Sequence, residues 1–293
     1  MEMLLLGGDR RMLYAAGRLS ALGYGVRLGG YEPQPGFLEL RFTAQDAWRE
    51  AVRHSDTVVL PFFTRGKTGK TAIKSDFSGE EIYADEIARI VTPEQPILAG
   101  MPPEDVRSMF FGKGLALLDY FARDELAIAN AVPTAQGVLA LLIEQLEKAV
   151  AECTICVTGY GRCARSLARA LRGLGTHVVI AARKKRDLAQ IRADGYEPLA
   201  LSELPVAVAK LDALVNTIPT QVITADTLAA FRQDCLLIEI ASAPFGIDSD
   251  VAKSIGMPYI YAPSLPGKTA PKTAGEIIAD TVDSMLRELA RSQ

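Results

Sequence analysis

The sequence has few cysteines, few aromatic residues and little net charge, and each shortage excludes a class of protein. Four cysteines in 293 residues are too few for a disulfide-stapled secreted scaffold. Lysine plus arginine number 32 and aspartate plus glutamate 35, so the net charge of −3 lacks the basic excess typical of nucleic-acid binders. No apolar run approaches the roughly 20 residues that cross a bilayer. The opening MEMLLLGGDRR is too short for a signal-peptide core. We therefore expect a cytoplasmic protein that binds neither nucleic acid nor a membrane.

Short apolar runs alternate with amphipathic segments along the whole chain. Hydrophobic residues make up 49% of the sequence, which is enough for two cores. This alternation predicts an α/β fold with two doubly wound parallel-sheet domains. In the first series we expect strands at 3–8, 25–30, 57–62, 97–99, 115–118 and 127–129, helices at 10–22, 44–53 and 78–90, and a mobile loop at 66–76. The helix at 78–90 is expected to open with a capping box formed by Ser78 and Glu81.

The second series begins with a glycine-rich turn. Residues 154–183 read TICVTGYGRCARSLARALRGLGTHVVIAAR, in which Gly159, Gly161 and Ala164 fit the G-x-G-x-x-G/A pattern between a strand and a helix. In that setting Gly159 permits the tight turn, Gly161 lets the backbone approach a pyrophosphate, and Ala164 allows close packing. The pattern predicts a Rossmann dinucleotide-binding domain. We expect its cofactor contacts to be Gly159, Tyr160, Gly161, Arg162, Cys163, Ala164, Arg183, Lys184, Thr217, Ile218, Pro219 and Ala241.

The end of the second strand of this domain indicates which cofactor is bound. NAD-binding domains usually place an acidic residue there to bind the ribose 2′-hydroxyl. This chain has four cations, residues 183–186, before its first acid at Asp187. A planar guanidinium such as that of Arg183 suits a phosphate, so the pattern favours NADP.

Domain boundaries follow from these two series. Residues 133–151 are predicted to form one connecting helix with Pro133 in its first turn. We expect an N-terminal flavodoxin-like α/β domain over 1–132 and the Rossmann domain over 152–267. The second series ends near Ala262 and leaves one amphipathic segment without a following strand, so the C-terminal helix, 268–293, is expected to complete the N-terminal domain.

Several segments together resemble the dipicolinate synthase family, in its A-type subunit. The resemblance covers nearly the whole chain, and its most specific part is the pair of runs APSLPG and APKTAG. The chain departs from the family where Ala164 and Ser264 replace glycines, where Gln136 replaces a glutamate, and where APFG at 243–246 varies a Pro-Gly-Gly stretch. The segments that carry the resemblance are LGGDR at 6–10, VPT at 132–134, GYGR at 159–162, NTIP at 216–219, APSLPG at 262–267 and APKTAG at 270–275.

The resemblance implies a reaction, a partner and a setting. Members act with a flavoprotein-like B-type subunit and oxidise a dihydrodipicolinate-type intermediate to dipicolinate, which is pyridine-2,6-dicarboxylate. The setting is the cytoplasm of the mother cell of a sporulating bacterium. The substrate is a dianion, so its site needs cations or N–H groups, which we expect in a cleft at the carboxyl ends of both sheets. The substrate-binding candidates are Arg10, Arg65, Lys67, Thr134, Lys268 and Lys272.

The proton acceptor is the least defined part of this hypothesis. Asp9 and Lys272 are the catalytic candidates, although Asp9 equally fits the N-cap of the following helix. His54 and His177 are expected to be structural. Cys153 and Cys156 lie in a predicted strand, so we expect buried thiols and no metal.

Three functional hypotheses remain open from the sequence. The first is an NADP-dependent oxidoreductase subunit that makes dipicolinate. The second is a non-catalytic scaffold that binds nucleotide or substrate for the flavoprotein-like partner. The absence of an obvious acid–base residue favours this second hypothesis. The third is a related two-domain amino-acid or 2-hydroxy-acid dehydrogenase, which would need a histidine in the cofactor cleft. A homo-oligomer is compatible with each of them.

Overall fold

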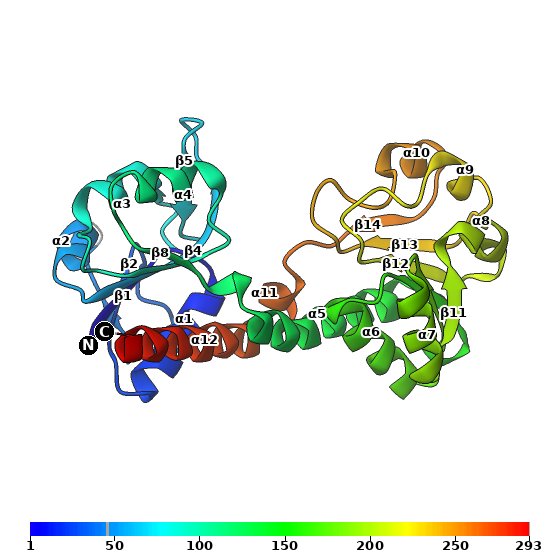
Figure 1. Cartoon of the computed structure of the whole chain (residues 1–293), viewed down its shortest axis with the longest axis horizontal. Helices are drawn as coiled ribbons and strands as arrows, with labels where there is room; N and C mark the ends of the chain where they lie inside the picture. The colour runs from blue at the N-terminus through cyan, green and yellow to red at the C-terminus, as the bar shows by residue number, and fades with distance from the viewer. Residues whose placement is uncertain (45–46, 293) are drawn as a thin grey trace. The chain divides into compact units, whose positions relative to one another are not determined.

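The computed structural model describes residues 1–44 and 47–292, and the chain divides into two units. Unit 1 comprises Met1–Asn130 and the residues from Ala270 onward, and unit 2 comprises Ala131–Thr269. Each unit is built on a mainly parallel sheet flanked by helices (Figure 1), which confirms the predicted fold class. The helix predicted over 44–53 includes residues 45 and 46, and the segment predicted over 268–293 includes residue 293; these three lie outside the described residues.

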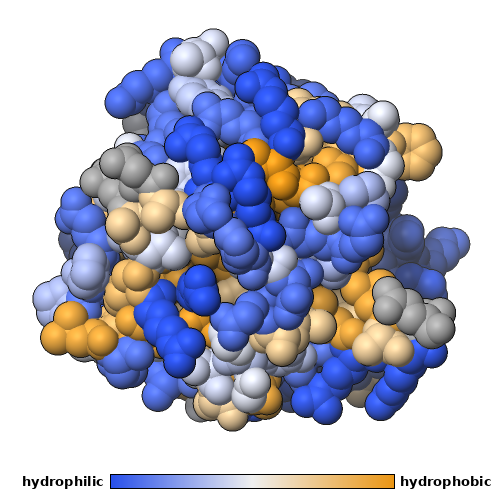
Figure 2. All heavy atoms as spheres, turned by 90° about the vertical axis from the view of Figure 1, so that its left-hand side faces the viewer, coloured by the Kyte–Doolittle hydropathy of each residue, from blue (hydrophilic) through white to orange (hydrophobic). Residues whose placement is uncertain are grey.

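In unit 1 the parallel strands run in the order β3-β2-β1-β4-β7-β8, and the antiparallel strands β5 and β6 extend from β4. The central strand β1 is buried on both faces, as its run of apolar residues requires. Apolar cores lie on the two faces of the sheet. The side of the molecular surface seen in Figure 2, by contrast, is mainly hydrophilic. The strands are β1 (Glu2–Leu6), β2 (Gly25–Gly29), β3 (Arg41–Phe42), β4 (Thr57–Arg65), β5 (Thr71–Lys74), β6 (Glu81–Tyr83), β7 (Ile97–Gly100) and β8 (Leu117–Asp119).

The last helix of the chain, α12 (Pro271–Ser292), belongs to unit 1 and packs along α1 (Arg10–Ala21). A Cβ built at Gly275 would lie 2.2 Å from the carbonyl oxygen of Arg11, so the first turns of the two helices are in close contact. Further along, Arg18 Nε donates to Asp280 Oδ1 at 2.8 Å, and the two helices therefore run in the same direction. The helices of unit 1 are α1 (Arg10–Ala21), α2 (Trp48–Arg53), α3 (Ala84–Ile90), α4 (Glu104–Phe111), the 3-10 turn η2 (Tyr120–Ala122) and α12 (Pro271–Ser292).

The sheet of unit 2 is parallel throughout, with the strand order β11-β10-β9-β12-β13-β14. This order is that of two mononucleotide-binding halves that meet between β9 and β12. The strands are β9 (Thr154–Thr158), β10 (His177–Ala182), β11 (Glu197–Ala200), β12 (Ala213–Asn216), β13 (Leu236–Glu239) and β14 (Tyr259–Tyr261). The helices are α6 (Arg162–Gly173), α7 (Lys185–Ala193), α8 (Leu204–Ala207), α9 (Ala225–Leu228), α10 (Ser249–Ser254) and α11 (Leu265–Thr269), with 3-10 turns η3 (Val150–Glu152), η4 (Leu201–Glu203) and η5 (Val208–Lys210).

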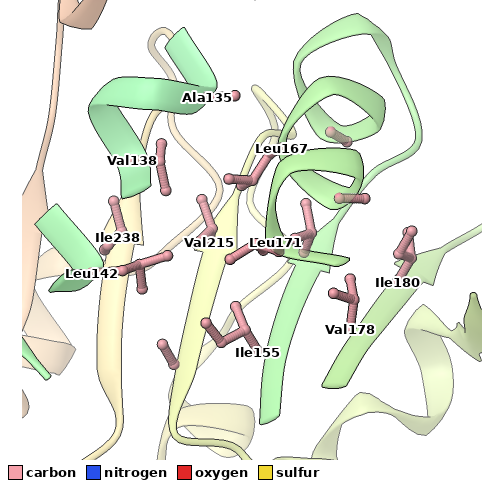
Figure 3. Close-up of a cluster of buried hydrophobic side chains, with 14 of the residues drawn as sticks. Ala135, Val138, Leu142, Ile155, Leu167, Leu171, Val178, Ile180, Val215 and Ile238 are labelled. Carbon is pink, nitrogen blue, oxygen red and sulfur yellow. The ribbon is translucent and has the colours of Figure 1, made fainter. Parts of the chain in front are cut away.

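A long helix, α5 (Asp124–Gln145), contributes its second half to the core of unit 2. Figure 3 shows Val138 and Leu142 of α5 packed toward the same sheet face as Leu167 and Leu171 of α6. The strand side chains beneath them include Val215. The first half of α5 gives Leu126 to the core of unit 1, so the boundary between the units falls inside this helix.

The extent of α5 corrects the strand predicted over 127–129, the connecting helix predicted over 133–151, which ends at Gln145, and the expected absence of a long apolar run. Residues 127–129, predicted as a strand, are helical, and Pro133 lies inside the helix rather than in its first turn. By length and composition α5 is apolar enough to cross a membrane, with a mean hydropathy of 1.8 over its 18-residue window, so the expectation that no such run exists is also wrong. Its buried side chains belong to the two cores, and we therefore assign it as a core helix. Pro133 hid this length because proline more often begins a helix than interrupts one.

A hairpin replaces the mobile loop predicted over 66–76. Strand β4 continues to Arg65, and the chain then turns back into β5, with Gly66 N donating to Lys70 O at 2.9 Å. Gly69 has a φ of +77°, which explains a glycine at this turn. The prediction of a capping box formed by Ser78 and Glu81 is also wrong. The Ser78 hydroxyl donates to Gly30 O at 2.8 Å, and Glu81 begins β6 rather than lying in a helix.

Two positions where glycine was expected hold other residues in the left-handed backbone region. Ser264 has a φ of +58°, and Phe245 has a φ of +68°. A residue with a Cβ is destabilised by about 1–2 kcal/mol in the left-handed region. Glycine avoids this strain, but its greater freedom in the unfolded chain offsets part of the gain in stability. Because Ser264 is exposed, we predict that Ser264→Gly raises the free energy of unfolding by about 0.5–1 kcal/mol. Urea titration measures this, and a decrease would contradict the strain argument.

Candidate functional site

The turn between β9 and α6 has the geometry of a phosphate-binding loop. Gly159 has a φ of +87°, and a Cβ there would lie 2.7 Å from Thr217 Oγ1, so no other residue fits without a shift. A Cβ at Gly161 would meet open space. Gly161 is the N-cap of α6, and no side chain caps this helix end. Ala164 is fully buried, as close helix–strand packing requires. The turn therefore presents backbone and a helix N-terminus to an approaching anion.

A pocket of about 250 Å³ opens beside this turn. Of the four consecutive cations predicted to select the cofactor, Arg183 and Lys184 line the pocket, whereas Lys185 and Arg186 do not. Asp187 also lines it and is paired with Arg186, Nε to Oδ1, at 3.3 Å. No ion pair or hydrogen bond of the Arg183 guanidinium is seen among residues 1–44 and 47–292. The pocket is thus lined by Arg183, whose guanidinium is available to a ligand, and by Asp187, whose charge is partly neutralised by Arg186.

Two side chains next to the turn have altered acidity. Burial raises the pKa of Tyr160, and its hydrogen bond to Asp194 raises it further. The guanidinium of Arg165 lies 4.7 Å from the centre of the Tyr160 ring. Burial raises the pKa of the Cys163 thiol. Both groups therefore stay protonated near neutral pH, which suits a structural role at the turn better than proton transfer.

The segment after β12 lies against the turn from the other side. Thr217 Oγ1 donates to the carbonyl oxygen of Thr158 at 2.7 Å, and Ile218 lines the same pocket. Pro219 is exposed. Ala241 N donates to Glu239 Oε1 at 2.9 Å, and Glu239 is fully buried. Glu239 is a further candidate that no motif predicts; its one mark in the sequence is a charged residue at the end of an apolar strand.

In unit 1 Arg11 is a further candidate that no motif predicts. Asp9 N-caps α1 by accepting from Arg11 N at 2.9 Å, and the Arg11 guanidinium binds the same carboxylate with Nε at 2.9 Å and Nη2 at 2.6 Å. The Arg11 side chain is 10% exposed and lies 5.0 Å from the Phe62 ring centre. Its spacing with Ala15 and Leu19 on the buried stripe of α1 was the available signal.

Two buried tyrosines stand at the same end of the unit 1 sheet. Tyr31 donates to the carbonyl oxygen of Gly7, and Tyr120 donates to that of Leu60 at 2.9 Å. Burial raises the pKa of both hydroxyls well above the usual range, and the nearby carboxylate of Asp9 adds to this. They are neutral hydrogen-bonding groups in this setting.

The predicted substrate-binding residues are dispersed. Arg10 is exposed on α1, and Lys272 is exposed in the first turn of α12, the helix whose Gly275 packs against Arg11 of α1. Arg65 and Lys67 lie on the β4–β5 hairpin, where Arg65 Nη1 is 3.8 Å from Asp105 Oδ2. Lys268 is exposed on α11 of unit 2.

Thr134 needs a correction. It lies within α5, past Pro133, and not at the start of a helix. The prediction that helix-start N–H groups at Thr134 hold a carboxylate is therefore wrong, because an N–H deep in a helix faces the carbonyl oxygen of the preceding turn.

Both histidines, predicted to be structural, are exposed and contact a nearby glutamate. His54 contacts Glu50 O through Nδ1 at 2.9 Å, and His177 Nε2 lies 2.8 Å from Glu197 Oε2. His177 borders a larger pocket of about 580 Å³ at the amino ends of β9, β10 and β11, away from the glycine turn. Cys153, Cys156 and Cys235 are buried free thiols, and burial raises the pKa of the last two to about 12.

Family models match both halves of the chain. Residues 2–121 match the N-terminal domain of the A-type subunit of dipicolinate synthase, and residues 136–260 match the NAD-binding domain of D-isomer specific 2-hydroxyacid dehydrogenases. With the strand order and the glycine turn, the second match defines unit 2 as a nicotinamide-dinucleotide-binding domain of dehydrogenase type. The chain thus has the architecture of a two-domain oxidoreductase.

Similarity to the A-type subunit of dipicolinate synthase extends over the whole chain. The A-type subunit of dipicolinate synthase from Bacillus subtilis is 28% identical over 99% of this chain and 97% of its own. The crystal structure of the Bacillus halodurans protein of the same name is 29% identical, covers 97% of both chains and has a TM-score of 0.87. A transhydrogenase from Sinorhizobium meliloti, 14% identical over 98% of this chain and 94% of its own with a TM-score of 0.71, shares the fold. The resemblance to the dipicolinate synthase family, in its A-type subunit, is confirmed.

Proposed function

We propose that this chain is the NADP-dependent oxidoreductase subunit of a dipicolinate synthase, which oxidises a dihydrodipicolinate-type intermediate to dipicolinate during sporulation. The observation that carries the proposal is the glycine turn of unit 2, beside a pocket lined by Arg183, in a chain whose other half matches a dipicolinate synthase domain. The glycine turn alone is common among dehydrogenase-like proteins, and its combination with the dipicolinate synthase domain narrows the class of reaction.

The residues of unit 2 suit a dinucleotide along its length. The backbone from Gly159 to Gly161 and the first turn of α6 would hold the pyrophosphate. Arg183 and Lys184 would hold a ribose 2′-phosphate, because their charges have no competing acid except Asp187, which Arg186 engages. The segments at 217–219 and at Ala241 would contact the nicotinamide half, since they follow the strands of the second mononucleotide-binding half.

The reaction itself needs positioning more than strong catalysis. Conversion of a dihydropyridine dicarboxylate into an aromatic ring removes one hydride and one proton, and aromatisation makes this downhill. A nicotinamide held by unit 2 would supply the acceptor for the hydride and its two electrons. The protein must hold two carboxylates and receive the proton. We assign the carboxylates to Lys272 and to the edge of the Arg11 guanidinium that Asp9 leaves uncovered, with Arg10, Arg65, Lys67 and Lys268 as further candidates.

One observation favours the non-catalytic alternative. Asp9, the proposed base, accepts from the N–H of Arg11 and from its guanidinium, so its lone pairs are largely occupied. A scaffold that binds nucleotide for a flavoprotein-like B-type subunit would need no free base here. Turnover of NADP⁺ by the isolated chain distinguishes the two, because a scaffold has none until the B-type subunit is added.

Lys272 offers a direct test of the substrate assignment. We predict that Lys272→Met lowers kcat/KM for the dicarboxylate about tenfold or more, because a charged hydrogen bond of about 1.5–3 kcal/mol is lost. NADP affinity should stay within a factor of two of the unmodified protein (~0.4 kcal/mol). Lys113→Met, which removes an equal charge after α4, is the control. An unchanged kcat/KM, measured with the B-type subunit present, would remove Lys272 from the site.

A further inference from the structure

A buried carboxylate stands where β13 ends, beneath the loops of the candidate site. Glu239 has no exposed surface. Its Oε1 accepts from Ala241 N at 2.9 Å, and its Oε2 accepts from Gly246 N and Ile247 N, both at 2.9 Å. The amide Nδ2 of Asn216 donates to both oxygens, at 2.8 and 3.0 Å. Every partner is a donor, so the site is built for a group that only accepts hydrogen bonds.

Asn216 transmits this arrangement to the neighbouring strand. Besides Glu239, its Nδ2 donates to Ile218 O at 2.9 Å, while its Oδ1 accepts from Ile218 N at 3.2 Å and from the hydroxyl of Thr158. The loop after β13 closes tightly on this amide: a Cβ at Gly246 would lie 2.2 Å from Asn216 Nδ2. Three strand ends are therefore joined by one buried polar network.

The network reaches the glycine turn in one more contact. Thr217 follows Asn216, and its Oγ1 donates to Thr158 O. The same Oγ1 lies so close to Gly159 that an added Cβ there would be 2.7 Å from it. A shift of Glu239 would thus displace residues 241–247 directly and 216–218 through Asn216. An apolar residue at this position would leave three backbone N–H groups and the Asn216 amide without acceptors, so the carboxylate fixes the course of the loop at 241–247.

We propose that Glu239 is a positioning residue for the nicotinamide half of the bound dinucleotide. The inference rests on the proposed cofactor function. The two mononucleotide-binding halves meet between β9 and β12. In such a domain the adenosine half of a dinucleotide lies over β9 and β10, and the nicotinamide half lies over β12 and the strands that follow it. The loop at 241–247, which Glu239 orders directly, follows β13, whereas Arg183 and Lys184 follow β10. The pocket beside these two cations is shared with Ile218 and residues 220–222 after β12.

Half-cofactor binding tests this division. Glu239→Gln keeps the size of the side chain but turns an NH₂ group toward N–H donors. We expect it to weaken binding of NADPH, or of NADH if that is the ligand, by about tenfold or more. Binding of adenosine 2′,5′-bisphosphate or AMP, which carry only the adenosine half, should change less than about twofold. Asn216→Ala, which leaves Glu239 its three backbone donors, should show the same split with a smaller loss.

Asp212→Asn is the matched control. Asp212 lies just before the amino end of β12, is 10% exposed at its side chain, and accepts from Thr154 N at 2.8 Å. Its loss should lower the thermal midpoint without any split between whole and half cofactor. Equal losses of whole and half cofactor in Glu239→Gln, or no loss, overturn the positioning role. Failure of the unmodified chain to bind either dinucleotide overturns the proposed cofactor function, and this inference with it.

Discussion

Replacement of Gly159 by valine is expected to lower the affinity for nicotinamide dinucleotides by at least about 100-fold. The reason is twofold. A β-branched residue is strained by more than about 1–2 kcal/mol at a φ of +87°, and its Cβ would press on Thr217 Oγ1, so the turn must shift away from the position that admits a pyrophosphate. Isothermal titration with NADPH and NADH measures the loss.

A second glycine of the same strand–helix unit provides the control for that substitution. Gly173 lies near the end of α6, where an added Cβ meets nothing within 4 Å. Gly173→Ala should bind the dinucleotide normally and gain about 0.5–1 kcal/mol of stability, because alanine is the better helix former. Normal binding by Gly159→Val would contradict the assignment of the turn.

Reversal of charge at Arg183 should change which cofactor is preferred. If the Arg183 guanidinium binds the ribose 2′-phosphate, Arg183→Asp loses about 1.5–3 kcal/mol of that contact and adds repulsion. The ratio of NADP to NAD affinity should then fall by about 10- to 100-fold. Fluorescence titration with both reduced cofactors measures the ratio.

Lys185 makes this test specific. Lys185→Asp changes the net charge equally, but Lys185 is exposed and does not line the pocket, and the Arg186–Asp187 pair stays in place. It should alter the ratio by less than about threefold, mainly through long-range charge that salt screens. Equal effects of the two variants, or equal affinity of the unmodified protein for both cofactors, would contradict a specific 2′-phosphate contact.

The sequence was most informative where one local pattern determines structure. The spacing of Gly159, Gly161 and Ala164 between an apolar run and an amphipathic segment predicts the turn, and the turn has the geometry that this pattern predicts. Apolar runs predict most strands of both sheets, because a parallel strand is buried on both faces and its composition shows it.

The sequence was least informative where distant segments meet. The pairing of β5 with β4 depends on a turn at Gly66–Gly69 that fits a loop equally well, and Pro133 concealed a continuous helix. Arg11 and Glu239 were missed because their roles come from partners: a carboxylate and an aromatic ring for Arg11, and the amide of Asn216 with the loop at 246–247 for Glu239. No spacing rule predicts contacts that depend on the packing of separate elements.

One measurement tests the central claim most directly: the formation of dipicolinate together with reduced nicotinamide, with a dihydrodipicolinate-type substrate, NADP⁺, the B-type subunit and either this chain or its Gly159→Val variant. The account predicts one reduced nicotinamide for each dipicolinate formed by the unmodified chain, and loss of both products with the variant. Dipicolinate formed at the same rate by the variant, or formed without reduction of NADP⁺, would contradict the assignment of the oxidation to the nucleotide site of unit 2.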